Sequence, residues 1–104
     1  MASRYTLDER IAQQRALLDE LTARQAKERR RRDTRRKAVV GATILSRVRV
    51  DEAQLRRLVN SLDAHCTRPS DRAFLGLPPE RPGAEGRAEG ALDAGEVARR
   101  LLED

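Results

Sequence analysis

The stretch that decides the fold is TLDERIAQQRALLDELTARQAKERRRRDTRRK, residues 6–37, which contains no glycine or proline. Thr6 and Glu9 have the spacing of a capping box, in which each side chain accepts a hydrogen bond from the backbone amide of the other residue, so a helix should start here. Seven positions then follow at alternating spacings of four and three, typical of a coiled-coil seam: Leu7, Ile11, Gln14, Leu18, Leu21, Gln25 and Glu28.

This pattern predicts an amphipathic, coiled-coil-like helix over residues 1–26. Three of the seven seam positions are polar, so two interpretations remain open. The helix either pairs with a second chain or packs as a solvated amphipathic helix on the rest of its own chain. In the first case, dimerisation runs through Leu7, Ile11, Leu18 and Leu21, with the apolar residues between Val39 and Val48 contributing.

Residues 27–37 form a basic segment with eight cations and two carboxylates. At about 100° per residue the cations fall all round a helix axis, which suits a DNA groove flanked by phosphates better than a flat membrane surface. The segment has no aromatic residue on which single-stranded bases would stack, so duplex DNA is the favoured ligand. A solvated charge run, a nuclear-import signal or an RNA-contacting tract are the alternatives. The predicted nucleic-acid contacts are Lys27, Arg29, Arg30, Arg31, Arg32, Arg35, Arg36 and Lys37.

Residues 38–77 are predicted to form a helical hairpin that holds the core. Its first helix continues to about Val48, a turn follows, and Asp51 with Gln54 starts a second helix. This second helix should end at Thr67 or Arg68, because the residue before a proline is disfavoured in a helix. One further turn should run from Pro69 to Gly76, with Phe74, Leu75 and Leu77 folding back on the hairpin.

Residues 78–104 carry four cations and seven carboxylates and begin with a stretch of prolines and glycines that lacks large apolar residues. We predict a flexible acidic tail, consisting of a disordered linker up to Gly90 and a short terminal helix. Asp93 and Glu96 supply a capping box for that helix. Because isolated helices of this length are marginal, it should form on a partner or against the basic segment.

The composition limits the core of the molecule. Hydrophobic residues make up 38% of the 104 residues, and the aromatic residues are Tyr5 and Phe74. The expected fold is therefore all-α and extended, with a core completed by self-association. The single cysteine cannot form an intrachain disulfide, residues 1–10 lack the apolar run of an export signal, and nine uncharged residues are too few to span a bilayer. We expect a cytoplasmic protein without a membrane partner.

Catalytic groupings are absent from the sequence. His65 and Cys66 are the only residues of their types, and two soft ligands fall short of the four that a structural zinc takes. Neither a phosphate-binding loop nor a nucleophile elbow is present. We predict that the protein is not an enzyme and uses no cofactor or metal.

Two segments resemble the small conjugal-transfer and mobilisation accessory proteins, the TraD/MobC-like relaxosome components. They are DTRRKAVVGA, residues 33–42, and TRPSDRAFLGLP, residues 67–78. The resemblance covers roughly residues 6–78 and excludes the coupling ATPase that shares the TraD name, because the phosphate loop is missing. It implies a plasmid or integrative-element protein that assists a relaxase at the transfer origin without catalysis of its own.

The function expected from the sequence is thus that of a DNA-binding accessory protein of conjugative transfer, with transfer-origin duplex DNA and a relaxase as partners. The alternative is a helical adaptor whose basic segment contacts an acidic protein, with no DNA role. Salt dependence and competition by duplex DNA separate these two functions.

Overall fold

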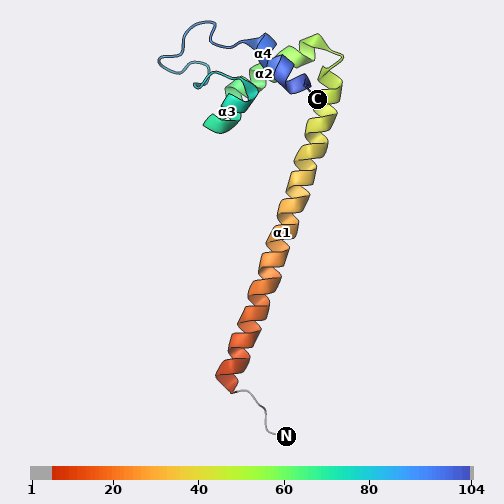
Figure 1. Cartoon of the computed structure of the whole chain (residues 1–104), viewed down its shortest axis with the longest axis vertical. Helices are drawn as coiled ribbons and strands as arrows, with labels where there is room; N and C mark the ends of the chain where they lie inside the picture. Colours follow the sequence, from red (N-terminus) through yellow and green to blue (C-terminus); the bar gives the residue numbers. More distant parts are fainter. Residues whose placement is uncertain (1–5, 104) are drawn as a thin grey trace. The chain divides into compact units, whose positions relative to one another are not determined.

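The computed structural model describes residues 6–103, and within them the chain is all-helical, as predicted (Figure 1). Residues 1–5, which include Tyr5, and Asp104 lie outside the described residues. The chain divides into two compact units, one ending at Val40 and one beginning at Gly41, and each is described by itself. The helices are α1 (Leu7–Val48), α2 (Glu52–His65), α3 (Pro69–Leu75) and α4 (Ala94–Leu102).

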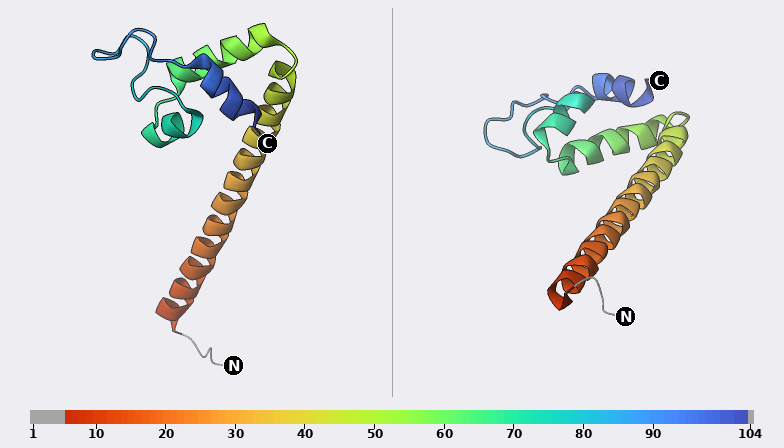
Figure 2. Two further views of the ribbon diagram at one scale, coloured as in Figure 1. Left: turned by 45° about the horizontal axis from the view of Figure 1, so that its top comes forward. Right: turned by 60° about the horizontal axis from the view of Figure 1, so that its bottom comes forward.

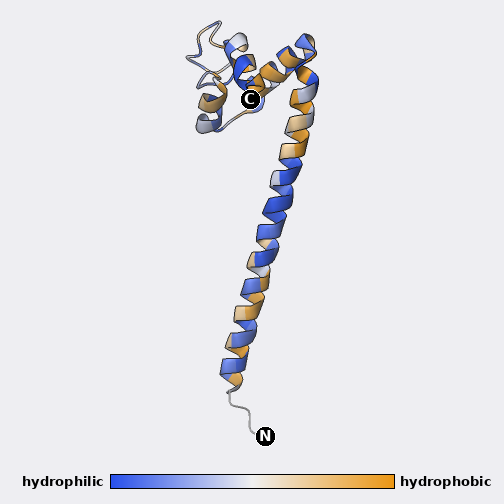
Figure 3. Ribbon diagram, turned by 45° about the vertical axis from the view of Figure 1, so that its right-hand side comes forward, coloured by the Kyte–Doolittle hydropathy of each residue, from blue (hydrophilic) through white to orange (hydrophobic). Residues whose placement is uncertain are grey.

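The long helix α1 confirms the prediction from residues 6–37. It starts where the capping pattern places it, because the Glu9 amide donates to the Thr6 hydroxyl oxygen over 3.1 Å. It then continues without a break for 42 residues, or about 63 Å at 1.5 Å per residue. The hydrophilic middle of α1 separates two parts that carry apolar residues (Figure 3).

The turns around α2 and α3 follow the local signals of the sequence. Asp51 accepts a hydrogen bond from the Gln54 amide over 3.2 Å and so caps the start of α2. The end of α2 at His65 comes two or three residues earlier than the predicted Thr67 or Arg68, and Cys66 already has an extended backbone. Pro69 opens α3, and Gly76 ends it in the left-handed conformation with φ +75°.

The core lies in the unit that begins at Gly41, around the buried residues Val59, Leu77 and Val97. Helix α4 contacts both α2 and α3, and it lies beside α2 (Figure 2). Leucines from three parts of the chain pack against the three buried residues: Leu55, Leu62, Leu75, Leu92 and Leu101.

The predicted packing of residues 38–77 is wrong in two respects. The extensive helix contact of α2 is with α4 rather than with the end of α1, so the expected hairpin is not the core. Val40 and Ile44 of α1 remain exposed, and only Val48 is buried there. Phe74 does not fold back with Leu77, because it lies on the outer side of α3 with 78% of its surface exposed.

The prediction of a flexible tail from Pro78 is also wrong, because both the linker and the terminal helix are tied to the core. Three consecutive tetrapeptides of the linker, RPGA, AEGR and AEGA, each form a turn closed by a backbone hydrogen bond of 3.2 Å. Each has its glycine in third place with φ between +76° and +88°, as a type II turn requires. Helix α4 buries Val97 completely against the core. Its capping contact, from the Glu96 amide to Asp93, was predicted correctly.

A buried ion network holds the linker in place. The five donor positions of the Arg72 guanidinium are all used: Nε donates to the Pro78 carbonyl, Nη1 to the carbonyls of Asp63 and Cys66, and Nη2 to Asp63 Oδ1 and the Glu80 carbonyl. From the linker, Arg87 donates to both carboxylate oxygens of Asp63 over 3.1 and 2.8 Å. Asp63 thus joins α2, α3 and the linker.

Burial by itself would raise the pKa of the Asp63 carboxyl group. The hydrogen bonds and the positive charges of Arg87 and Arg72 outweigh burial, and the pKa lies below its usual value of 3.8. Asp63 therefore stays ionised in the folded protein at neutral pH.

Candidate nucleic-acid interface

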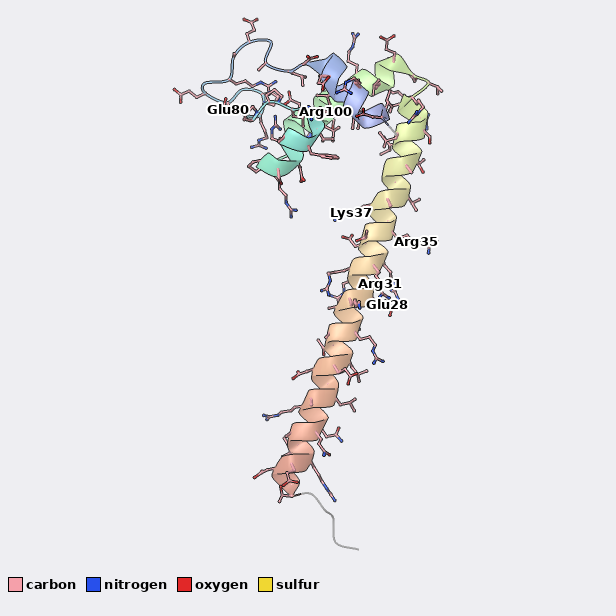
Figure 4. All side chains as sticks on the ribbon, viewed as in Figure 1. Glu28, Arg31, Arg35, Lys37, Glu80 and Arg100 are labelled. Atoms are coloured by element: carbon pink, nitrogen blue, oxygen red, sulfur yellow. The ribbon has the colours of Figure 1, made fainter. Side chains whose placement is uncertain are left out.

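The predicted basic segment, residues 27–37, lies in the middle of α1, and all eight of its cations are exposed. At about 100° per residue they surround the axis, and the widest gap between neighbouring cations is about 80°. Arg35 and Lys37 leave the helix on opposite sides (Figure 4). A ligand that lies along the segment therefore meets positive charge whichever face of the helix it approaches.

Two of the eight cations have a carboxylate partner within the segment. Asp33 contacts Lys37 over 3.0 Å and Arg36 over 3.8 Å, and all three side chains are largely exposed. Such surface pairs are weak and exchange readily with an incoming anion. Among residues 6–103, no ion pair involves Lys27, the run Arg29 to Arg32, or Arg35. These six cations are thus available to an external anion.

The net positive charge of the molecule comes from the unit that contains this segment. Residues 1–40 carry twelve cations and six carboxylates, whereas residues 41–104 carry ten cations and eleven carboxylates. In the second unit many of the charges are paired internally. Glu96 is an example, because its hydrogen bonds from Arg99 and Arg100 lower its pKa to about 2. The electrostatic attraction for a polyanion therefore comes from α1.

The four predicted dimerisation residues are exposed on α1, with 73% of Leu7, 43% of Ile11, 61% of Leu18 and 48% of Leu21 accessible. Among the described residues of the unit that ends at Val40, α1 is the one helix, so these side chains have no second helix of that unit to pack on. An apolar row of this length is typical of a surface that binds another helix.

The role of Arg72, which lies in the second segment of the family resemblance, is not predicted from the sequence. Its side chain is 2% exposed and supports the fold, so it is not available to a nucleic acid. Sequence signals alone do not identify its partner Asp63, nine residues earlier on another helix. His65, which is not predicted to bind a metal, lies at the end of α2. Its Nδ1 atom is 2.9 Å from the carbonyl oxygen of Ser61.

No helix among residues 6–103 is long and apolar enough to cross a membrane. Comparison with protein-family models finds no match, and no solved structure matches the chain. A protein of Escherichia coli named Mobilization protein C is 39% identical over 80 residues, covering 77% of this chain and 85% of the relative. Mobilization protein MobS of Acidithiobacillus ferridurans is 46% identical over 46 residues, covering 44% of this chain and 47% of the relative.

Proposed function

Since the chain belongs to the family of mobilization protein C, we propose that it acts in plasmid mobilisation as a DNA-binding accessory protein that assists a relaxase at the transfer origin. In this role it works in the cytoplasm and carries out no catalysis of its own. The observation that carries the DNA-binding proposal is the unbroken, exposed helix over residues 27–37, with cations on all sides and six of them without an ion pair in the described chain.

Duplex DNA is the proposed ligand because of the shape and composition of this helix. An α-helix fits the major groove, which is about 12 Å wide, and cations on opposite flanks of the helix reach the phosphates of both strands. The segment offers no aromatic side chain for stacking on unpaired bases. The eight cations proposed to contact phosphates are Lys27, Arg29, Arg30, Arg31, Arg32, Arg35, Arg36 and Lys37.

The functional form is proposed to be a homodimer held by α1. The exposed row of Leu7, Ile11, Leu18 and Leu21 supports this proposal, because a second copy is the simplest partner for an unpaired coiled-coil seam. A dimer brings two basic segments to one DNA molecule. The second contact is then intramolecular, so affinity rises without any new type of contact.

The test is the salt dependence of binding to duplex DNA from the transfer-origin region, followed by fluorescence anisotropy. If one chain neutralises about six phosphates, log affinity should fall against log salt with a slope near −5, at about 0.9 per phosphate. Replacing the four residues from Arg29 to Arg32 with alanine should make the slope less steep by about 3.6 for each chain in the complex.

The matched control changes the same number of charges in the second unit, on four exposed arginines: Arg56, Arg57, Arg68 and Arg81. This variant should keep the slope of the wild type. A wild-type slope near −1, or equal losses in the two variants, contradicts the proposal. Binding to an acidic protein that duplex DNA does not displace would favour the adaptor function.

A further inference from the structure

The apolar residues of α1 lie toward its two ends, with the basic segment between them (Figure 3). Leu7, Ile11, Leu18 and Leu21 occupy the first part, and Val40 and Ile44 the last part. Residues 22–37 contain no large apolar side chain. Along the axis, two copies of α1 therefore place apolar residues level with apolar residues in either orientation, so the axial spacing of these residues does not select one.

Charge selects the orientation. In a parallel pair in register, residues 27–37 of one copy lie beside residues 27–37 of the other, and each carries eight cations and two carboxylates. Packed helices have axes 8–10 Å apart, which is about one Debye length at 0.1 M salt, so this repulsion is only partly screened. A parallel pair therefore places the strongest like charges of the molecule side by side.

An antiparallel pair with level ends avoids this repulsion. The α1 helix runs from residue 7 to residue 48, so residue 7 of one copy lies level with residue 48 of the other. For every such pair of positions the two residue numbers add up to about 55. Residues 27–37 then face residues 18–28 of the second copy, which carry two cations and three carboxylates. The +6 segment thus meets a slightly negative one, and Ile11 lies level with Ile44 along the axis.

We propose that two copies of this chain pair along α1 in antiparallel orientation, with their helix ends level, and so join the two basic segments end to end. This inference rests on the homodimer proposed above and adds its geometry. From Lys37 of one copy to Lys37 of the other, the joined segments span about 28 Å at 1.5 Å per residue. That length approaches the 34–36 Å of one turn of B-DNA.

Crosslinking of cysteine variants tests the orientation on the full-length chain. The single natural cysteine is first removed by Cys66→Ser. Gln14→Cys and Val40→Cys are then made separately, mixed in denaturant, refolded together and treated with a short bis-maleimide. Both positions are exposed on α1, and the antiparallel register places each close to the other.

The expected result is a covalent dimer from the mixture at a yield at least fivefold above that of either variant alone. Crosslinking within each single variant, with no additional product from the mixture, indicates a parallel pair and overturns the proposal. A mixture that gives no covalent dimer overturns the level register.

Glu28→Cys, made together with Cys66→Ser, distinguishes a dimer of another orientation or register from the absence of any dimer. Residue 28 lies near the midpoint of α1, so this variant should link to itself in either orientation. If it gives no covalent dimer and light scattering finds a monomer, both this geometry and the proposed homodimer are wrong. The salt slope on DNA is measured without crosslinker, so DNA binding stands or falls on its own result.

Discussion

The substitution Asp63→Ala should unfold or severely destabilise the unit that begins at Gly41. Asp63 is buried and accepts three charged hydrogen bonds, one from Arg72 and two from Arg87. Without its carboxylate, the Arg72 guanidinium remains buried with no negative partner. Removing one member of a buried ion pair costs about 3–5 kcal/mol, because the remaining charge is left uncompensated.

This loss is large compared with the stability of the unit. Residues 41–104 are 64 residues, and about 0.05–0.15 kcal/mol per residue corresponds to a total of about 3–10 kcal/mol. Asp63→Ala should therefore remove a third or more of the free energy of unfolding. Arg87→Ala should cost less than Asp63→Ala, since Asp63 then keeps the Arg72 partner.

Cys66 provides a local assay for this effect, because it is the single cysteine and packs half-buried against the core. Its rate of reaction with a thiol reagent, measured against urea concentration, reports opening of this unit separately from melting of the rest of α1. Asp71→Ala is the matched control, since Asp71 is an exposed aspartate on α3. A difference of less than about 0.5 kcal/mol between Asp63→Ala and Asp71→Ala, the range usual for surface changes, would refute the structural role of the network.

Three further predictions concern pH, the core and the seam. Folding lowers the pKa of Asp63, so the ionised carboxylate stabilises the fold fully above the usual pKa of 3.8, and this stabilisation is lost as the pH falls through the lower pKa of the folded state. In urea titrations at acid pH, the free energy of unfolding of Asp63→Asn should therefore fall less with decreasing pH than that of the wild type. Val97→Ala should cost about 2 kcal/mol in the Cys66 assay, from two buried methyl groups and the remaining cavity, whereas exposed Val50→Ala should cost almost nothing. Leu18→Asp should weaken dimerisation in light scattering and DNA binding together, whereas Ala16→Asp, on the opposite face, should change both less.

The parts of the fold that sequence predicted are those set by neighbouring residues. Thr6 with Glu9, and Asp51 with Gln54, act over three residues, and the structure shows the amide-to-side-chain hydrogen bond at each site. The absence of glycine and proline in residues 6–37 predicted an unbroken helix through the basic segment for the same reason. A pattern of neighbouring residues predicts the structure correctly where the interactions that stabilise it join residues close in sequence.

The parts that sequence did not predict depend on distant partners. The composition of the linker is that of a disordered segment, and its three turns would be short-lived on their own. What fixes them is the contact of Arg87 with Asp63, which lies 24 residues earlier in the chain. Likewise, the apolar residues near Ile44 predicted burial against α2, but α4 covers α2 and Ile44 remains exposed.

The seam of α1 belongs to a third class, because in the proposed homodimer it is a second copy of the chain that covers it. One chain leaves Leu18 and Val40 exposed, so neither its sequence nor its own packing decides what covers them. The salt slope on DNA links this question to function. A single basic segment that neutralises about six phosphates gives a slope near −5, whereas two segments joined in a dimer give a slope near −10. If the wild type has a slope of log affinity against log salt near −10 and Leu18→Asp halves it, the apolar seam is required for two basic segments to bind one DNA molecule.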